Sequence, residues 1–478
     1  MNTMPPQAAA STLPAAHSRL RVMLEAPIVP MLARMGWSNM LMMLAQSSTG
    51  LVETWFLAKL GTQVLAGIAV VVPLLMLMQN MSQGAMGGGI SSSVARSLGS
   101  GNAALTNQLA RHAVALNTLI GIAFSAVLLT IARPLLQALG AHGAALDAAT
   151  TYGHVLLAGL PLMWAMNALA SVIRGSGNMT VPGAVICGGA LLLIPLSPCL
   201  IFGVGPLPRL GVAGGAWALI AYYAAGTAIL GWYCASGRNP ARLLRGPLHW
   251  APMRGILTVG GLAAMNPLLT NALIAMTGAT VGAHAGTAAL AGYATAARLE
   301  YLLIPIAFGL GAPMVALVGA NMGAGQRERA RSIALTGAAM AFVLTELVGI
   351  AAALWPHAWL VLFGANEQLV ETGTTYLRII GPFYGFYGLG LSLYFAAQGA
   401  GRLASPLGAA ALRVALYAGV GTLALQVTGS LPVFFAIGAI AMVAYGAIVF
   451  WSAASGRWFV ASQAAVAKNR HRDYRMKY

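Results

Sequence analysis

Long apolar stretches run through this sequence and limit the folds that are open to it. A helix that crosses a bilayer needs about 20 mainly apolar residues. We therefore expect twelve membrane-spanning helices, at residues 28–57, 63–95, 109–132, 151–172, 180–204, 211–235, 254–283, 287–320, 333–354, 373–397, 405–427 and 432–455. Only 7% of the 478 residues are charged, against about 25% in soluble proteins. The sequence thus predicts an all-α polytopic membrane protein.

The basic residues predict how the chain is oriented. With the N-terminus placed inside, nearly all loop and tail lysines and arginines fall on the inner side, and only Lys59, Arg133 and Arg209 fall outside. This bias is the positive-inside pattern of a multi-pass plasma (inner) membrane protein with both termini cytoplasmic. It also explains the net charge of +17. Because the basic residues form no single stripe, we expect no nucleic-acid partner.

The sequence repeats itself with a period of about half its length. The segment RGSGNMTVP at 174–182 matches QGAGRLASP at 398–406, and GTQVLAG at 61–67 matches GTAALAG at 286–292. Each half holds six expected spans, so both halves have the same orientation and are related by an axis along the membrane normal. Two pseudo-symmetric six-helix bundles with a cleft between them suit alternating access.

We therefore expect five regions. A cytoplasmic, disordered N-terminus at 1–26 precedes an N-lobe at 27–235, a cytoplasmic linker at 236–253, a C-lobe at 254–455 and a basic cytoplasmic tail at 456–478.

Motifs in both halves resemble those of multidrug and toxic compound extrusion (MATE) transporters, from about residue 25 to 455. They include GLVETWFLAKLGTQVLAG, IRGSGNMTVP, AGYATAARLEYLLIPIAFGLG and AAQGAGRLASP. The resemblance implies two six-helix lobes that form a V, and secondary active export of organic cations or amphipathic drugs. It further implies antiport driven by protons or sodium ions, with no cofactor, no catalytic residue and no resident metal, in a monomer embedded in lipid.

Glu53 is the leading candidate for coupling. It lies inside an expected span, where a charge costs about 2.5–3.5 kcal/mol, so an acid there is a functional hypothesis by default. The resemblance places Glu53 where the family usually has an Asp associated with cation or proton coupling. The alternative is that Glu53 lies near the outer end of its helix and is merely hydrated.

Other positions depart from the family pattern. The fifth helix of many relatives carries an Asn and an Asp before Pro, and this chain has Leu193 and Ser197 before Pro198. Two sodium ligands are thus missing, which favours proton coupling. Where some relatives place acids on the seventh and tenth helices, this chain has Asn271 and Tyr387.

Further polar residues are candidates for lining a substrate cleft. Gln46, Asn80 and Gln83 lie on N-lobe spans, and they either line the cleft or join helices. Arg298 and Glu300 are two residues apart, so they point to different helix faces and do not pair directly. Glu300 is either half of an ion pair between helices or a cargo contact, and the same two readings are open for Glu346.

Two other functions are open to a membrane protein of this kind. A lipid-linked precursor or polysaccharide flippase of the same superfamily should have a strongly basic cleft. A membrane-embedded transferase should show a His/Asp or Asp/Asp pair, which the scattered histidines do not provide. No Walker lysine follows the glycine-rich loops, so an ATP-driven pump is unsupported. We therefore expect a transporter and not an enzyme.

Overall fold

The computed structural model describes residues 13–203, 208–363 and 367–460, and this part of the chain is helical with no strand. The first half contains α1 (Leu13–Glu25), α2 (Ile28–Ala58), α3 (Thr62–Gln79), the π-helix η1 (Asn80–Met86), α4 (Gly87–Gly99), α5 (Ala103–Ala138), α6 (Gly143–Ala158), α7 (Leu160–Gly175), α8 (Thr180–Phe202) and α9 (Val212–Ala235). The second half contains α10 (Trp250–Ala263), α11 (Met265–Gly323), α12 (Arg327–Leu354), α13 (Pro356–Leu360), η2 (Val361–Phe363), α14 (Glu367–Ile380), η3 (Gly381–Phe383), α15 (Tyr384–Ala400), α16 (Ala404–Val414), η4 (Ala415–Gly421), α17 (Thr422–Thr428), α18 (Leu431–Ala454) and η5 (Arg457–Phe459). The expected all-α membrane fold is confirmed.

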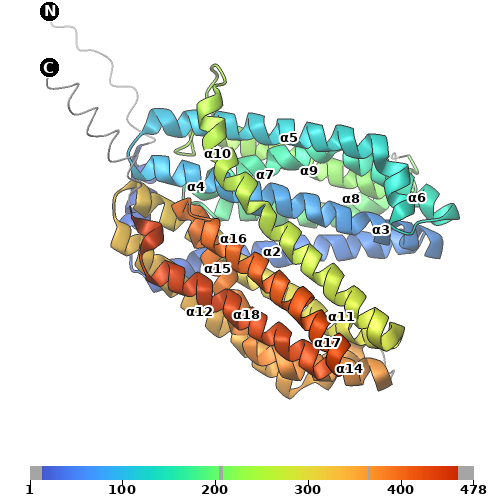
Figure 1. Ribbon diagram of the computed structural model, residues 1–478. Helices are drawn as coiled ribbons and strands as arrows, with labels where there is room; N and C mark the ends of the chain where they lie inside the picture. The colour runs from blue at the N-terminus through green and yellow to red at the C-terminus, as the bar shows by residue number, and fades with distance from the viewer. Residues whose placement is uncertain (1–12, 204–207, 364–366, 461–478) are drawn as a thin grey trace, which may run out of the picture.

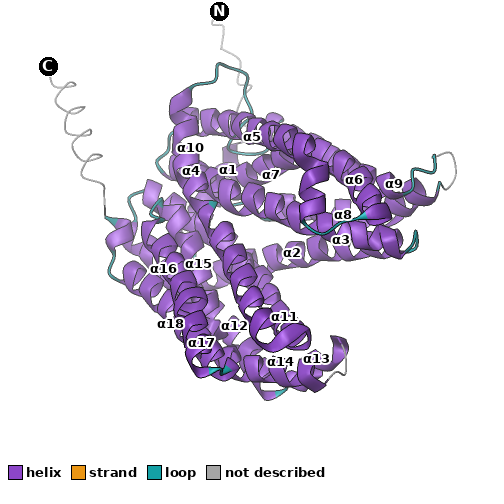
Figure 2. Cartoon of the chain, turned by 45° about the vertical axis from the view of Figure 1, so that its right-hand side comes forward, coloured by secondary structure: helices purple, strands orange, loops and turns teal. Residues whose placement is uncertain are grey.

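The helices form two bundles that meet at one end. Helices α2–α9 make the N-lobe and α11–α18 the C-lobe, while α10 packs against α4, η1 and α5 of the N-lobe. The bundles touch where α4 meets α11 and α15, and they diverge toward α6 and α14 (Figures 1 and 2). We call these the closed end and the open end. At the closed end, Asn39 Nδ2 on α2 donates to the Phe308 carbonyl on α11 at 3.0 Å.

The two lobes are built from equivalent contacts. A Cβ added to Gly67 on α3 would lie 2.4 Å from the Ala145 carbonyl oxygen on α6, and a Cβ on Gly292 would lie 2.4 Å from the Leu369 carbonyl on α14. These pairs hold matching positions of the sequence repeat. Because only glycine permits such an approach, the same backbone packing recurs in each lobe. The repeat is therefore structural.

At one helix crossing, between α4 and α11, the pseudo-symmetry relates the two contacting helices to each other. A Cβ on Gly99 of α4 would lie 2.0 Å from the Ala320 carbonyl oxygen of α11, and a Cβ on Gly323 of α11 would lie 2.1 Å from the Arg96 carbonyl oxygen of α4. Gly99 and Gly323 are 224 residues apart, and so are Arg96 and Ala320. Each helix thus offers its partner the same glycine and the same carbonyl, which places the pseudo-two-fold axis between α4 and α11 at the closed end.

The spans differ in detail from those expected. By length and composition, nine described helices could cross a membrane, or ten if the pair α6 and α7, bent by 46°, counts as one span. One of the nine runs from Trp250 to Gly323 and covers two expected spans, because α11 joins two helices that are separated by a sharp turn of the backbone at Gly286 (φ 82°). Twelve crossings therefore remain a prediction.

The N-terminal region is more ordered than expected. Residues 13–25 form α1, whereas we expected 1–26 to be disordered; residues 1–12 lie outside the described part. The reason is tertiary: Met23 is buried, and its carbonyl accepts a hydrogen bond from Asn321 Nδ2 at 3.1 Å. Of the predicted tail at 456–478, residues 461–478 lie outside the described residues.

Candidate functional site

Glu53 is buried inside the N-lobe. Its side chain on α2 is 9% exposed, and the Tyr152 hydroxyl on α6 donates to its Oε1 at 2.8 Å. A Cβ on Gly215 of α9 would lie 3.0 Å from the same oxygen, so the absence of a side chain there leaves room for the carboxyl group. Glu53 therefore sits where α2, α6 and α9 meet, and the reading that it is merely hydrated does not fit this burial.

Among the described residues, no basic side chain forms an ion pair with Glu53. The described residues form four ion pairs within 4 Å, and Glu53 belongs to none of them. Burial disfavours the charged form of a carboxyl group unless a partner compensates it. A tyrosine hydroxyl is a neutral partner that can donate to the charged form or accept from the protonated form. The arrangement is therefore chemically suited to gain and lose a proton.

The C-lobe also holds a carboxylate that accepts a hydrogen bond from a tyrosine, but this carboxylate has a cationic partner as well. Tyr376 lies 224 residues after Tyr152, and its hydroxyl donates to Glu300 Oε1 on α11. The other oxygen of Glu300 lies 3.6 Å from Arg413 Nη2 on α16, with both side chains largely shielded from solvent. Equivalent tyrosines thus hold one acid in each lobe, but only the C-lobe acid is paired with a cation. Between the two readings for Glu300, this geometry favours an ion pair between helices.

A polar network joins α2, α3, η1 and α7 of the N-lobe. Gln79 Nε2 donates to Gln83 Oε1 at 2.7 Å, and Gln46 Nε2 approaches the same oxygen at 3.5 Å. Asn167 on α7 donates to Ser82 Oγ at 3.2 Å. Gln46 and Gln83 are thus brought together.

The polar network lies at an irregular helix. Gln83 belongs to the π-helical segment η1, and π-bulges often mark functional sites. Gln46 lies seven residues before Glu53 on α2, which is about two turns and the same helix face. The third predicted N-lobe residue, Asn80, is exposed on η1 and lies outside the network.

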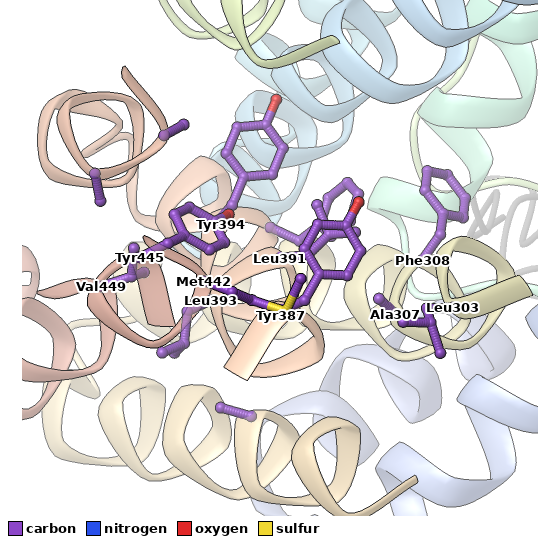
Figure 3. Close-up of a cluster of buried hydrophobic side chains, with 14 of the residues drawn as sticks. Leu303, Ala307, Phe308, Tyr387, Leu391, Leu393, Tyr394, Met442, Tyr445 and Val449 are labelled. Atoms are coloured by element: carbon purple, nitrogen blue, oxygen red, sulfur yellow. The ribbon is translucent and has the colours of Figure 1, made fainter. Parts of the chain in front are cut away.

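The C-lobe contains a small, partly open pocket. Tyr387 on α15 and Arg413 on α16 line it, with the Arg413 guanidinium 4.9 Å from the centre of the Tyr387 ring. Tyr387, Leu391 and Tyr445, all lining residues, are drawn in Figure 3. Tyr387 is therefore placed in this pocket, next to the ion pair of Glu300.

Two predicted C-lobe residues lie elsewhere. Asn271 is exposed, and its Nδ2 donates to the Pro267 carbonyl of its own helix at 2.8 Å. Its neighbour Thr270 lines the C-lobe pocket instead. Arg298 is exposed, with its guanidinium 5.6 Å from the centre of the Phe363 ring.

Glu346 joins two helices. Its Oε2 on α12 accepts a hydrogen bond from the Gly385 backbone N–H at the start of α15, at 2.6 Å. Within the described residues, no group of three His, Cys, Asp or Glu side chains could hold a metal ion.

Sequence reasoning missed several partners. Tyr152 and Asn167 were not singled out, because each lies on a different helix from the residue that drew attention. Gln79 lies one helical turn before Gln83, so its i,i+4 spacing was a signal that could have found it. The repeat offers a signal for one of them, since Tyr152 and Tyr376 fall at the same offset as the matched glycine motifs.

Comparison with known proteins identifies the family of this chain and several similar proteins. The family model MatE matches residues 39–199 and 263–423. The chain is 27% identical over 380 residues to a FAD transporter of Shewanella oneidensis, covering 78% of this chain and 82% of the relative. It is 27% identical over 371 residues to the probable multidrug resistance protein NorM of Thermotoga maritima, covering 75% and 77%. A solved structure of a multidrug resistance MATE family transporter of the MOP superfamily, in an outward-facing conformation, superposes with a TM-score of 0.80 at 20% identity, covering 89% of this chain and 95% of that one.

Proposed function

Since the chain belongs to the MatE family of membrane transporters, we propose that it is a secondary active multidrug exporter that works by proton-coupled antiport. Family members are transporters and not enzymes, which removes the transferase alternative. The observation that carries the coupling proposal is the buried carboxyl group of Glu53, which is hydrogen-bonded to Tyr152 and lacks a basic partner among the described residues.

The position of Glu53 connects the proton to the lobes. Glu53 lies toward the open end of α2, and Asn39, on the same helix, bonds the C-lobe carbonyl of Phe308. A change in how α2 packs against α6 and α9 is therefore transmitted along one helix to the contact between lobes. Protonation removes the charge that burial disfavours, so it biases which arrangement of α2 is stable.

The surroundings of Glu53 favour a proton over a sodium ion. A sodium ion needs several oxygen ligands, and the carboxylate here has one tyrosine hydroxyl as its hydrogen-bond partner. Leu193 and Ser197 stand where many relatives carry an amide and a second acid. One proton crossing 100 mV supplies about 2.3 kcal/mol, which is enough for a cargo gradient of some tens-fold.

The basic residues support the orientation. Arg96, Arg111 and Arg174 lie near helix ends at the closed end. The positive-inside rule then puts the closed end and both termini in the cytoplasm, and the described conformation opens outward. We place the protein in the plasma membrane as a monomer surrounded by lipid.

The cargo is proposed to be an organic cation or amphipathic drug, because a relative with 77% of its length matched is named as a multidrug resistance protein. A second candidate is export of a flavin dinucleotide, supported by the similarity to a FAD transporter. A flippase with a basic cleft is less well supported, because Arg298 and Arg378 are exposed and do not share the pocket of Arg413.

Export from proteoliposomes tests the proposal. A fluorescent cationic dye and, in parallel, FAD would be followed under an imposed pH gradient and, separately, a sodium gradient. We expect the pH gradient to drive export by wild type, and Glu53→Gln to abolish this while the protein remains folded. Glu371→Gln, at an exposed acid, is the matched control and should export like wild type. Undiminished export by Glu53→Gln would refute the coupling role.

A further inference from the structure

The linker between α9 and α10, at residues 236–249, is fixed against the first turns of α5. Asn107 Oδ1 accepts a hydrogen bond from the Arg242 backbone N–H at 2.7 Å, and Arg111 Nη2 donates to the Pro247 carbonyl at 2.7 Å. In Figure 2 the linker rises beyond α5 before α10 begins. Its backbone is therefore held by the N-lobe, and its exposed side chains form a fixed surface at the closed end.

Exposed arginines without a counter-charge cover this linker surface. They are Arg238, Arg242, Arg245 and, on α10, Arg254. None of these four belongs to the ion pairs of the described residues, and the sequence has no aspartate or glutamate from residue 148 to 299. Like charges on one surface repel one another, and a partner of opposite charge relieves the repulsion. The linker surface therefore fits an anionic partner.

Large apolar side chains are exposed among the same arginines. They are Trp232, Leu244, Leu248 and Trp250, each between 48% and 66% exposed. The Arg238 guanidinium lies 4.4 Å from the centre of the Trp232 ring. Basic side chains combined with exposed leucine and tryptophan are typical of segments that lie in the interface between lipid and water. The anionic partner therefore also offers apolar contacts.

The two tryptophans place the linker surface at the level of the lipid headgroups. Trp232 lies in the last turn of α9, and Trp250 is the first residue of α10. Both helices belong to segments that are long and apolar enough to cross a membrane. Tryptophan is enriched where such helices leave the hydrocarbon. Lipid therefore reaches this surface before any soluble partner does.

We propose that the linker surface binds the headgroups of anionic phospholipids. The four arginines attract the lipid phosphates, and Leu248 and Trp250 enter the interface beside them. The proposal rests on the orientation proposed above, because the cytoplasmic leaflet is the one with the negative surface potential that attracts basic segments.

The bound lipid acts at the connection between the lobes. Helix α10 packs against α4, η1 and α5 of the N-lobe, and the chain then continues into α11 of the C-lobe. A ligand stabilises the state that it binds. Anionic lipid therefore stabilises the packing of the linker and α10 against the N-lobe.

A spin label on the linker surface tests the proposal in nanodiscs of the full-length protein. The label is attached at Leu248→Cys after the three native cysteines are replaced, and a control label is attached at Gln326, an exposed residue of the C-lobe at the same end. Collisions with a water-soluble nickel complex report exposure to water. In discs of equal parts phosphatidylglycerol and phosphatidylcholine, we expect the label at 248 to be protected and the label at 326 to be exposed.

Two charge variants with equal net charge separate a local site from a general effect. Each arginine contributes about fivefold to affinity for an anionic surface, so changing three linker arginines to glutamine should expose the label at 248 to water. These are Arg242, Arg245 and Arg254. The matched control changes Arg327, Arg402 and Arg457, which are exposed arginines of the C-lobe, and it should leave the label protected.

The lipid composition and the salt concentration give a test that needs no charge variant. Discs of phosphatidylcholine alone, or potassium chloride raised to about 1 M to screen the charges, should expose the label at 248. Glycerol phosphate added to the phosphatidylcholine discs should not restore protection, because the surface requires a bilayer.

Three results would overturn the proposal. They are equal exposure at 248 and 326 in the anionic discs, equal protection in both kinds of disc, and equal loss of protection in the two charge variants. Restoration by glycerol phosphate would likewise overturn it in favour of a soluble anion. Neither a gradient nor cargo is used, and both faces of a nanodisc meet the same solution. This result and the Glu53 test therefore succeed or fail separately.

Discussion

The glycine crossing between α4 and α11 makes a quantitative prediction. In Gly99→Ala, the new Cβ would lie 2.0 Å from the Ala320 carbonyl oxygen. A carbon and an oxygen come no closer than about 3.3 Å, so the helices must separate by roughly 1 Å or more at the closed end. Overpacking of this kind costs about 1–3 kcal/mol. The cost falls only on conformations in which the crossing is made, so the ratio of closed to separated forms should fall about 5- to 150-fold.

Distances between spin labels at the open end measure this shift. Thr62 and Thr287 are exposed and begin equivalent helical segments of the two lobes. Labelled cysteines there, with Cys187, Cys199 and Cys234 replaced, report how far the lobes diverge. If the lobes rock, separation at the closed end brings the labels closer, and Gly99→Ala should populate shorter distances than its parent.

Two further variants sharpen the test of the crossing. Gly255→Ala is the matched control, because no atom lies within 4 Å of its added Cβ, and it should leave the distances unchanged. Gly323→Ala should act like Gly99→Ala, and the double variant should cost less than the sum, since the first substitution already separates the helices. Identical distance distributions for the parent and both single variants would refute the reasoning.

Two other predictions concern the acids of the two lobes. Tyr152→Phe removes the hydrogen bond that the Tyr152 hydroxyl donates to Glu53; we expect dye export driven by a pH gradient to slow by about tenfold, from roughly 1.4 kcal/mol, and export equal to wild type would contradict this. Arg413→Met leaves the half-buried Glu300 without its cation and should lower the free energy of unfolding by about 1–3 kcal/mol. The double variant Arg413→Met/Glu300→Gln should recover much of that loss in a denaturant titration, and no recovery would show that the pair is not what stabilises this region.

The fold was largely predictable because its signals are repetitive. Apolar runs of bilayer length and two matched glycine motifs recur along the chain, and the structure places matched glycines such as Gly67 and Gly292 at equivalent helix contacts. The order of α1 was not predictable, because it depends on a contact between Met23 and Asn321, residues almost 300 positions apart.

The candidate site was only partly predictable, and the limit is the partner. A lone acid in an apolar run signals burial, which is why Glu53 stands out. Whether such an acid is balanced depends on other helices. Glu300 forms an ion pair with Arg413, over a hundred residues away, whereas Glu53 accepts a hydrogen bond from Tyr152 and belongs to no ion pair of the described residues. Helix periodicity alone was enough to predict that Arg298 and Glu300 do not pair, because residues two apart point to different helix faces.

The reciprocal crossing of α4 and α11 has the form of an isologous interface, in which each partner presents the same patch to the other. A substitution that moves either helix of that interface alters both of its contacts. The two halves of the chain therefore depend on each other at this crossing. At other repeat positions the two halves differ, as at Arg174 and Gln398, which are 224 residues apart. The crossing of α4 and α11 has the two-fold symmetry of a homodimer interface. The residues around it differ between the two halves, and transport in one direction requires such a difference.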